Sequence, residues 1–312
     1  MNKVFDYSAN KVKFLLLPLI IIVLGIVMYF ANGGFNFDVE FMGGTRMQVD
    51  VGQAFNNGEV EKLVEDATGL DAVIQTGSTS SVVVIKLPAS ETPEKDEENK
   101  NNAFNALKEK YSLNDEALLS AQSADPSFGK EVQGKAVSFT LLAILFILIY
   151  IIIRFDWRSG VMAVFALVLN VLVMASVYTI TNIALNTTFI AAMLTVVGYS
   201  INNTIVIFDR IRENLRTRKR TETISQMTNR SIKETLGRTV NSTITTLITI
   251  VLIYILGVST IQQFALPLII GVVIGAYTSI FVASTFWAAW KEAEAEARAA
   301  AAMQRKSSKK NK

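Results

Sequence analysis

The sequence of 312 residues contains neither cysteine nor histidine. Without cysteine there is no disulfide framework, no thiolate nucleophile and no cysteine-based zinc site. Without histidine the chain lacks the commonest metal ligand and the side chain whose unperturbed pKa lies near neutrality. Charged residues are also scarce, at 18%, where soluble proteins carry about 25%. These absences exclude a Ser-His-Asp triad, a haem ligand and a typical zinc site, and we expect neither an enzyme nor a bound cofactor or metal.

Six long tracts contain no Asp, Glu, Lys or Arg. A helix needs about 20 mostly apolar residues to cross a hydrocarbon core of roughly 30 Å. We therefore predict an α-helical membrane protein with six transmembrane helices, at Phe14–Phe30, Ala136–Ile153, Gly160–Ile180, Thr188–Phe208, Thr239–Gly257 and Phe264–Trp287. The first tract follows Lys11 and Lys13, as in a signal peptide. It is longer than a typical h-region and no A-x-A site follows it, which favours a retained helix.

Basic residues are distributed unevenly around these tracts. The segments 1–30, 154–159, 209–238 and 288–312 hold 21 basic and 9 acidic residues, whereas the long segment 31–135 holds 9 basic and 18 acidic residues. Because cytoplasmic loops carry the excess of Lys and Arg, we predict that both termini, a basic loop 209–238 and a basic tail 291–312 are cytoplasmic, and that the domain 31–135 lies outside.

The charge pattern also bears on partners. The acidic outer domain argues against nucleic acid as a partner. The basic run Arg210–Arg220 is read as an orientation signal that faces anionic membrane lipids, in preference to an RNA site.

The outer domain shows the alternation of strands and helices expected of a β-α-β-β-α-β unit. Apolar and polar residues alternate in Thr45–Val51, and Val60, Leu63, Val64 and Ala67 follow at helical spacing. The remaining elements predicted are strands at Asp71–Gln75 and Val82–Leu87, a mobile acidic linker at Pro88–Asn102, a helix with Phe104, Leu107 and Tyr111 on one side, and a last strand at Ala117–Ala124. This order predicts a ferredoxin-like α+β fold between the first two spans. Such a domain is typical of a scaffold or a protein-contacting module.

Gly43 and Gly44 lie between two segments that both read as extended. A bulge or tight turn that only glycine tolerates is the preferred interpretation, and a direct ligand contact is the alternative.

Polar residues form stripes on the fourth and fifth spans. In the fourth, Thr188, Thr195, Tyr199 and Asn202 share one helical face, and Asn203 and Thr204 follow. In the fifth, Arg238, Ser242, Thr245 and Thr249 share a face, with Asn241 nearby. Both stripes are too polar for lipid, so we expect them to pack against each other or against another polypeptide. An ion or gating pathway and simple packing contacts remain equally open on this pattern.

The sixth span carries small residues at Gly271, Gly275 and Ser279. This spacing allows the backbones of two helices to approach closely and predicts a packing contact.

Three segments resemble the SecF subunit of the SecD/SecF protein-export accessory, a branch of the resistance-nodulation-division superfamily. They are Val197–Asn214, Asp38–Thr45 and Leu236–Thr246. The residues that carry the resemblance include Gly43, Gly44, Gly198, Tyr199, Asp209 and Arg210. The layout of six spans with one large loop agrees, so the resemblance extends over nearly the whole chain. It implies the cytoplasmic membrane of a bacterium.

One departure from the family pattern concerns mechanism. The family commonly has Asp at the position of Asn203, implicated in proton passage near an intramembrane Arg that matches Arg238. Asn does not ionise, and no predicted span offers a carboxylate or imidazole. Three interpretations remain: a partner supplies the carboxylate; Na⁺ binds to oxygens of Asn202, Asn203, Thr204 and Thr245; or the subunit is structural.

The resemblance implies a function in protein export. A SecD-like subunit would complete the machine, since transporters of this kind are built from two repeats with the ion path at their interface. The pair would use a transmembrane H⁺ or Na⁺ gradient, work with the SecYEG channel and engage the translocating unfolded polypeptide. The rival hypothesis is a secondary transporter for a small solute or lipid in the same superfamily, which would need a substrate pocket and a titratable group of its own.

Overall fold

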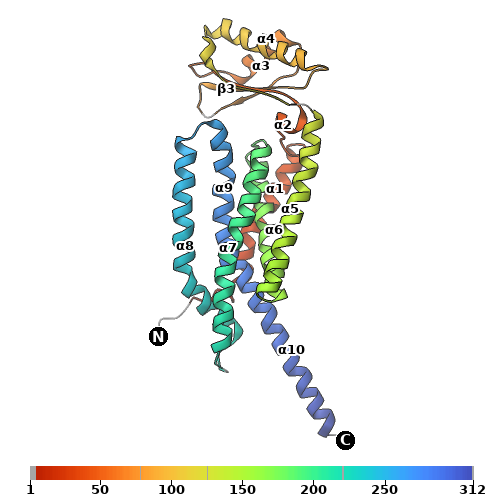
Figure 1. Cartoon of the computed structure of the whole chain (residues 1–312), viewed down its shortest axis with the longest axis vertical. Coiled ribbons are helices and arrows are strands. Elements are labelled where there is room, and N and C mark those ends of the chain that lie inside the picture. Colours follow the sequence, from red (N-terminus) through yellow and green to blue (C-terminus); the bar gives the residue numbers. More distant parts are fainter. Residues whose placement is uncertain (1–4, 78, 125, 220, 311–312) are drawn as a thin grey trace. The chain divides into compact units, whose positions relative to one another are not determined.

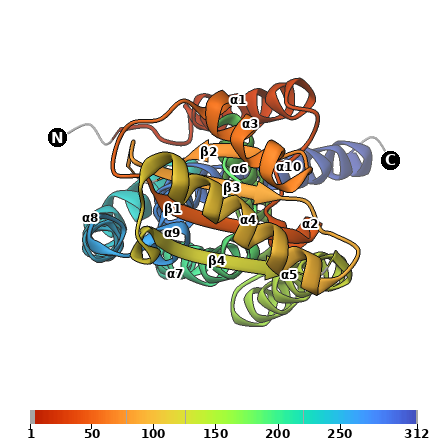
Figure 2. The same cartoon turned by 90° about the horizontal axis from the view of Figure 1, so that it is seen from above.

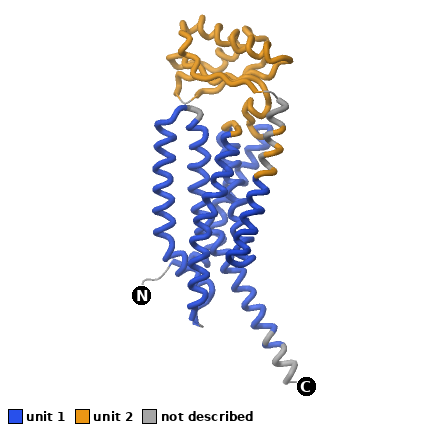
Figure 3. The backbone as a smooth tube through the Cα atoms, in the orientation of Figure 1, with its two compact units in different colours: residues 1–34, 140–182, 188–312 blue, residues 35–139, 183–187 orange. Residues whose placement is uncertain are grey.

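The computed structural model describes residues 5–77, 79–124, 126–219 and 221–310. The predicted tail 291–312 therefore extends beyond the described residues at 311–312. Contacts divide the chain into two compact units, coloured in Figure 3. The helical unit comprises Met1–Gly34, Thr140–Asn182 and Thr188–Lys312, and the sheet unit comprises Phe35–Phe139 and Ile183–Thr187.

The sheet unit contains a four-stranded antiparallel sheet with two helices. The strands are β1 (Gly44–Asp50), β2 (Val73–Thr76), β3 (Val82–Leu87) and β4 (Leu118–Ala124), in the order β2-β3-β1-β4. The helices are α3 (Asn57–Thr68) and α4 (Pro93–Tyr111), with the short α2 (Val39–Met42) before β1 and a 3₁₀ turn at Asp115–Ala117. Both α3 and α4 lie across one face of the sheet (Figure 2). Along the chain, the main elements follow each other as strand, helix, strand, strand, helix, strand.

The core of this unit lies between the sheet and its two helices. Alternate residues of β1 and β3 face the helices, because successive side chains of a strand point to opposite faces. The fully buried members are Met47, Val49, Val83 and Ile85 from the strands and Val60, Val64, Ala103 and Leu107 from the helices. The periodicities of two and 3.6 residues in the sequence therefore correspond to one shared apolar layer.

The prediction of a mobile linker at Pro88–Asn102 is wrong for most of its length. Helix α4 begins at Pro93, and the side chain of its N-cap residue Thr92 accepts a hydrogen bond from the backbone N–H of Lys95. Proline suits the first helical position because its missing N–H has no partner there anyway. The polar composition hid the helix, which buries only Ala103 and Leu107.

The expectation of an extended segment before Gly43 is also wrong. Asp38 caps the helical turn α2, and Gly43 ends that turn with a φ of 81°. Gly44 has a φ of 111°, and a Cβ atom built on it would lie 2.1 Å from the carbonyl oxygen of Leu87. Both positions thus require glycine for backbone reasons, one for its conformation and one also for the close approach of β3.

A buried charge cluster links α2 to the sheet. The carboxylate of Asp38 lies 3.3 Å from Arg46 Nη1 and 3.5 Å from Lys86 Nζ. Arg46 and Lys86 are directly opposite each other on β1 and β3, where two like charges repel. Burial lowers the pKa of Lys86, against the opposing effect of Asp38. The carboxylate of Asp38 therefore offsets the repulsion between two cations on neighbouring strands.

The segment Ile183–Thr187 joins the same unit from between the third and fourth apolar tracts. The backbone N–H of Asp38 donates to the carbonyl of Leu185 at 2.9 Å, and the carboxylate of Glu40 accepts hydrogen bonds from the N–H and hydroxyl of Thr187. Nothing in the hydropathy pattern indicated this contact.

The helical unit is built from long apolar helices (Figure 1). Their bounds are α1 Lys11–Ala31, α5 Pro126–Arg154, α6 Trp157–Ile180, α7 Thr187–Thr217, α8 Ile224–Leu256 and α9 Ser259–Thr278, which continues through a π-helical turn at Ser279–Ala283 into α10, Ser284–Lys310. Within the described residues, five helices are long and apolar enough to cross a membrane, and α5 carries a shorter apolar stretch at Ser138–Arg154. α1 and α8 bury little of their apolar surface within the chain, as lipid-facing helices do.

The predicted basic loop 209–238 is mostly helical. α7 continues to Thr217, and α8 begins at Ile224 with a capping box in which Thr223 and Gln226 bond reciprocally. Polar contacts join the two extensions, since Arg210 Nε lies 2.6 Å from Glu234 and Asn214 donates to Ser231 Oγ at 2.9 Å. The charged residues thus form a polar continuation of two antiparallel helices.

The cluster around Asp38 predicts a sensitive position in the sheet unit. Asp38→Asn retains the shape of the cap but removes the charge that faces Arg46 and Lys86, and we expect it to destabilise the unit by about 3–5 kcal/mol. Hydrogen exchange of the full chain, followed by mass spectrometry, should show faster exchange in β1 and β3. Asp71→Asn, at an exposed position of the same unit, is the matched control. Equal exchange in both variants would contradict the assignment.

Candidate functional site

Three levels of polar contact join α7 to α8. At the first, the hydroxyl of Tyr199 donates to Thr246 Oγ1 at 2.9 Å and lies 3.3 Å from the carbonyl of Ser242. The second and third are the Arg210–Glu234 and Asn214–Ser231 contacts. These pairs run in antiparallel register, so each turn of α7 has a fixed counterpart on α8.

We call this contact region between α7 and α8 the seam, and the stretch between its first and second polar contacts the gap. Asn203 lies in the gap. The register places it level with the turn Thr239–Thr243 of α8, which contains two more buried polar side chains. Asn203 is 1% exposed, Thr239 2% and Thr243 7%. Asn203 Nδ2, Thr239 Oγ1 and Thr243 Oγ1 have no hydrogen-bond partner among the described residues. Buried polar atoms without partners cost free energy, and the amide N–H of Asn203 needs an acceptor, such as a water molecule or a polar group of another polypeptide.

The other predicted pathway residues do not share this position. Thr204 is buried, and its hydroxyl lies 2.8 Å from Ser279 Oγ on the far side of α7. The four others, Asn202, Arg238, Asn241 and Thr245, are exposed on the surface of the described chain. The predicted stripes therefore meet through Tyr199 and Ser242, while much of their polar surface remains uncovered by this chain.

A second polar cluster lies inside the helical unit, between α6, α7 and α9. Asn170 Nδ2 donates to Ser200 Oγ at 2.7 Å, and the hydroxyl of Thr278 donates to Asn170 Oδ1 at 2.6 Å. With the Thr204–Ser279 contact, the cluster satisfies its side chains internally. Asn170 stands out in the sequence because its tract is otherwise almost uniformly apolar, whereas Thr278 gives no signal because Thr is common in membrane helices.

The small residues of α9 lie against α7 in matching steps of four. A Cβ atom on Gly271 would lie 2.3 Å from Val196 Cγ2, and one on Gly275 would lie 2.9 Å from Ser200 Oγ. The next step is the Ser279–Thr204 contact. Close approach of the backbones at the two glycines thus brings the hydroxyl pairs within bonding distance.

The residues that carry the family resemblance have diverse positions. Gly43 and Gly44 lie in the sheet unit, where they fulfil the backbone roles described above. Gly198 is exposed, with open space around the position of a Cβ atom. Asp209 pairs with Arg154 at 3.3 Å, and Arg210 pairs with both Glu213 and Glu234.

The described residues contain no group of three or more acidic side chains placed to hold a metal ion. The polar side chains that meet between α6, α7 and α9 are hydroxyls and amides.

Comparisons with known proteins agree with this architecture. The profile of the family "Protein export membrane protein SecD/SecF, C-terminal" matches residues 104–293, more than half of the chain. The protein translocase subunit SecF of Alicyclobacillus acidocaldarius is 33% identical over 93% of this chain and 94% of its own length. That of Thermodesulfovibrio yellowstonii is 36% identical over 89% of this chain and 92% of its own length. The chain belongs to the SecD/SecF family, as a SecF subunit.

Solved structures of the family share the fold. The crystal structure of SecDF from Thermus thermophilus, described as a translocon-associated membrane protein, matches with a TM-score of 0.81 and 32% identity. The match covers 93% of this chain but only 39% of the SecDF chain. This SecF-family chain is a multi-pass membrane protein of the bacterial Sec pathway and an accessory subunit of the protein translocase.

The α7–α9 contact leads to a prediction about stability. Gly271→Ala places a methyl group against Val196 and within 2.9 Å of Met174 Sδ. We expect it to destabilise the helical unit by about 1–3 kcal/mol, because a packed interior does not absorb an added methyl group freely. Thermal unfolding in detergent should show a lower Tm than Gly237→Ala, a control in open space on α8. An unchanged Tm for Gly271→Ala would refute the close contact.

Proposed function

We propose that this SecF-family subunit uses an ion gradient, together with a SecD-like partner, to promote protein export across the bacterial cytoplasmic membrane. One observation carries the proposal: α7 and α8 expose a polar face, formed by Asn202, Arg238, Asn241 and Thr245, in helices long enough to span a membrane. Polar groups facing lipid are costly, so this surface calls for a second polypeptide. The length of the SecDF relatives supports the same partner, since SecDF of Bacillus subtilis matches 93% of this chain with only 38% of its own length.

The chemistry of the seam indicates what this chain and its partner would each contribute. Asn203 provides a buried amide at the position where the family commonly has Asp, so the partner would supply the carboxylate that carries the proton. Binding of Na⁺ by oxygens of the gap is the second possibility. In both cases the ion passes where the exposed polar face of this chain meets the partner.

The remaining elements have roles in the same proposal. We infer six spans, with the apolar part of α5 as the second, and both termini in the cytoplasm with the basic segments. The strand order β2-β3-β1-β4 and the two helices on one face support a ferredoxin-like assignment for the sheet unit. Placed outside the membrane, this unit would engage the emerging polypeptide and work beside the SecYEG channel. The step is mechanical coupling without bond-making.

Co-purification tests the partner. The full chain, isolated from native membranes in mild detergent, should bring with it a SecD-like protein and components of SecYEG. Asn241→Trp, on the exposed polar face, should reduce recovery of the SecD-like protein about tenfold, equivalent to roughly 1.4 kcal/mol of affinity. Leu141→Trp is the control because Leu141 is an exposed apolar residue of α5. Recovery as a self-sufficient homo-oligomer with solute flux in vesicles would favour a transporter instead.

The variant Asn203→Asp tests the ion path. It introduces a titratable carboxyl at a buried position between α7 and α8. We expect export in membrane vesicles to become dependent on pH, changing severalfold between about pH 5 and pH 8. Asn105→Asp makes the same chemical change at an exposed position of the sheet unit and should have no such effect. If neither Asn203→Asp nor Arg238→Ala alters export beyond lowered abundance, only a packing role remains.

A further inference from the structure

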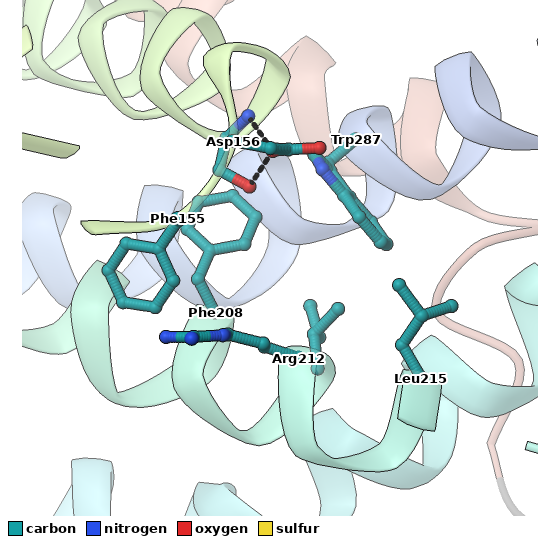
Figure 4. Close-up of a pocket in the computed structure, with 8 residues that line it drawn as sticks. Phe155, Asp156, Phe208, Arg212, Leu215 and Trp287 are labelled. Carbon is teal, nitrogen blue, oxygen red and sulfur yellow. Dashed lines mark hydrogen bonds between the residues drawn. The ribbon is translucent and has the colours of Figure 1, made fainter. Parts of the chain in front are cut away.

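A pocket of about 110 Å³ lies within the helical unit, at the end that carries the basic segments. The turn between α5 and α6 forms one wall, with Phe155 and Asp156, and Trp287 of α10 closes the side. One face of α7, from Phe208 to Leu215, forms the opposite wall and includes Arg212 (Figure 4). The cavity holds a small polar group and not a whole lipid or peptide.

The charges around the pocket leave one cation uncompensated. Asp156 forms an ion pair with Lys291 at 3.3 Å and accepts hydrogen bonds from the N–H and hydroxyl of Ser159. Arg154 pairs with Asp209, and Arg158 pairs with Glu294. In contrast, Arg212 donates to the backbone carbonyl of Arg154 at 3.3 Å and has no acidic partner among the described residues.

The charge of Asp156 is neutralised by Lys291 and not by Arg212. Burial alone would raise the pKa of the Asp156 carboxyl, but the hydrogen bonds from Ser159 and the ammonium of Lys291 outweigh that effect and lower it. Figure 4 shows Asp156 and Arg212 on opposite walls of the pocket. An anion beside Arg212 would therefore lie across the cavity from a carboxylate that Lys291 already neutralises.

A second donor in the pocket also lacks a partner. Trp287 is 3% exposed, and its indole N–H has no acceptor among the residues that the structure describes. Most of the remaining lining is apolar or aromatic, with Phe155, Phe208, Ile211 and Leu215. A positive group, a free N–H and an apolar surround fit a ligand that is anionic at one point and apolar beside it.

The surroundings have the composition of a membrane boundary. Trp157 and Trp290 lie edge to face, with ring centroids 4.9 Å apart. Arg158 lies over the ring of Trp157, and Lys291 lies over the ring of Trp287. Trp with Arg or Lys at a helix end is typical of the level of lipid headgroups. Leu215 is 37% exposed, so apolar surface leads outward from the pocket.

We propose that this pocket binds the phosphate of an anionic phospholipid, with Arg212 as the charged contact and the acyl chains lying outside along α7. Basic pockets between membrane helices on the cytoplasmic side recognise anionic headgroups in this way. The site is separate from the α7–α8 gap and does not depend on ion transport. It gives the subunit a specific lipid contact at the membrane surface.

Native mass spectrometry of the full chain in detergent tests the proposal. Titration with phosphatidylglycerol should give a bound lipid at lower concentration than titration with phosphatidylcholine. Arg212→Gln should weaken binding of phosphatidylglycerol about tenfold, as loss of a charge-assisted hydrogen bond would. Arg216→Gln removes the same charge one turn further along α7, outside the pocket, and should leave affinity within about twofold.

Two further measurements keep the outcome decisive. Trp287→Phe retains an aromatic ring but removes the indole N–H, and should weaken binding severalfold even if Arg212→Gln fails to fold. Glycerol 3-phosphate should not displace the lipid at millimolar concentration, since displacement would indicate a site for a soluble phosphate. Equal binding of both lipids, equal losses in the two Arg variants, or unchanged affinity in Trp287→Phe would each overturn the proposal.

Discussion

The structure depends on one constraint: a polar group inside a membrane helix needs a partner, because hydrocarbon offers none. Asn170, Ser200 and Thr278 satisfy this constraint within the chain by bonding across α6, α7 and α9. They meet because Gly271 and Gly275 remove the side chains that would hold α9 away from α7. The small residues and the polar residues are therefore two parts of one packing arrangement.

At the seam between α7 and α8, three buried polar side chains lack the partner that this constraint requires. Contacts above and below hold the two helices together, but Asn203, Thr239 and Thr243 remain buried without partners in the described chain. Satisfied clusters of hydroxyls and amides stabilise a bundle, whereas a buried polar gap needs water or an ion to complete it. Together with an exposed polar face on the same helices, these unpaired groups are the physical basis for proposing that the subunit works with a partner in the membrane.

Charged residues have different roles in the sheet unit and in the helical unit. In the sheet unit, the buried carboxylate of Asp38 pairs with Arg46 and Lys86 and so holds α2 against the strands. In the helical extensions beyond the apolar tracts, most charged residues pair with each other and continue the helices into water. Arg212 differs from these paired residues, because its guanidinium lines a cavity and meets only a backbone carbonyl.

The sequence by itself determined the apolar helices, the strands of the sheet unit and the family, since these follow from local periodicity and from runs of residues without charge. It missed the start of α4 and did not indicate that the segment 209–238 is mostly helical, because a helix that is mostly polar has little apolar periodicity and is defined by its caps and by contacts with a neighbour. It selected Asn203 but could not separate it from Asn202, although one is buried in the seam and the other is exposed. Only the tertiary structure decided that difference, and also the pairing of Asn170 with Thr278, because both depend on how helices distant in sequence are rotated against each other.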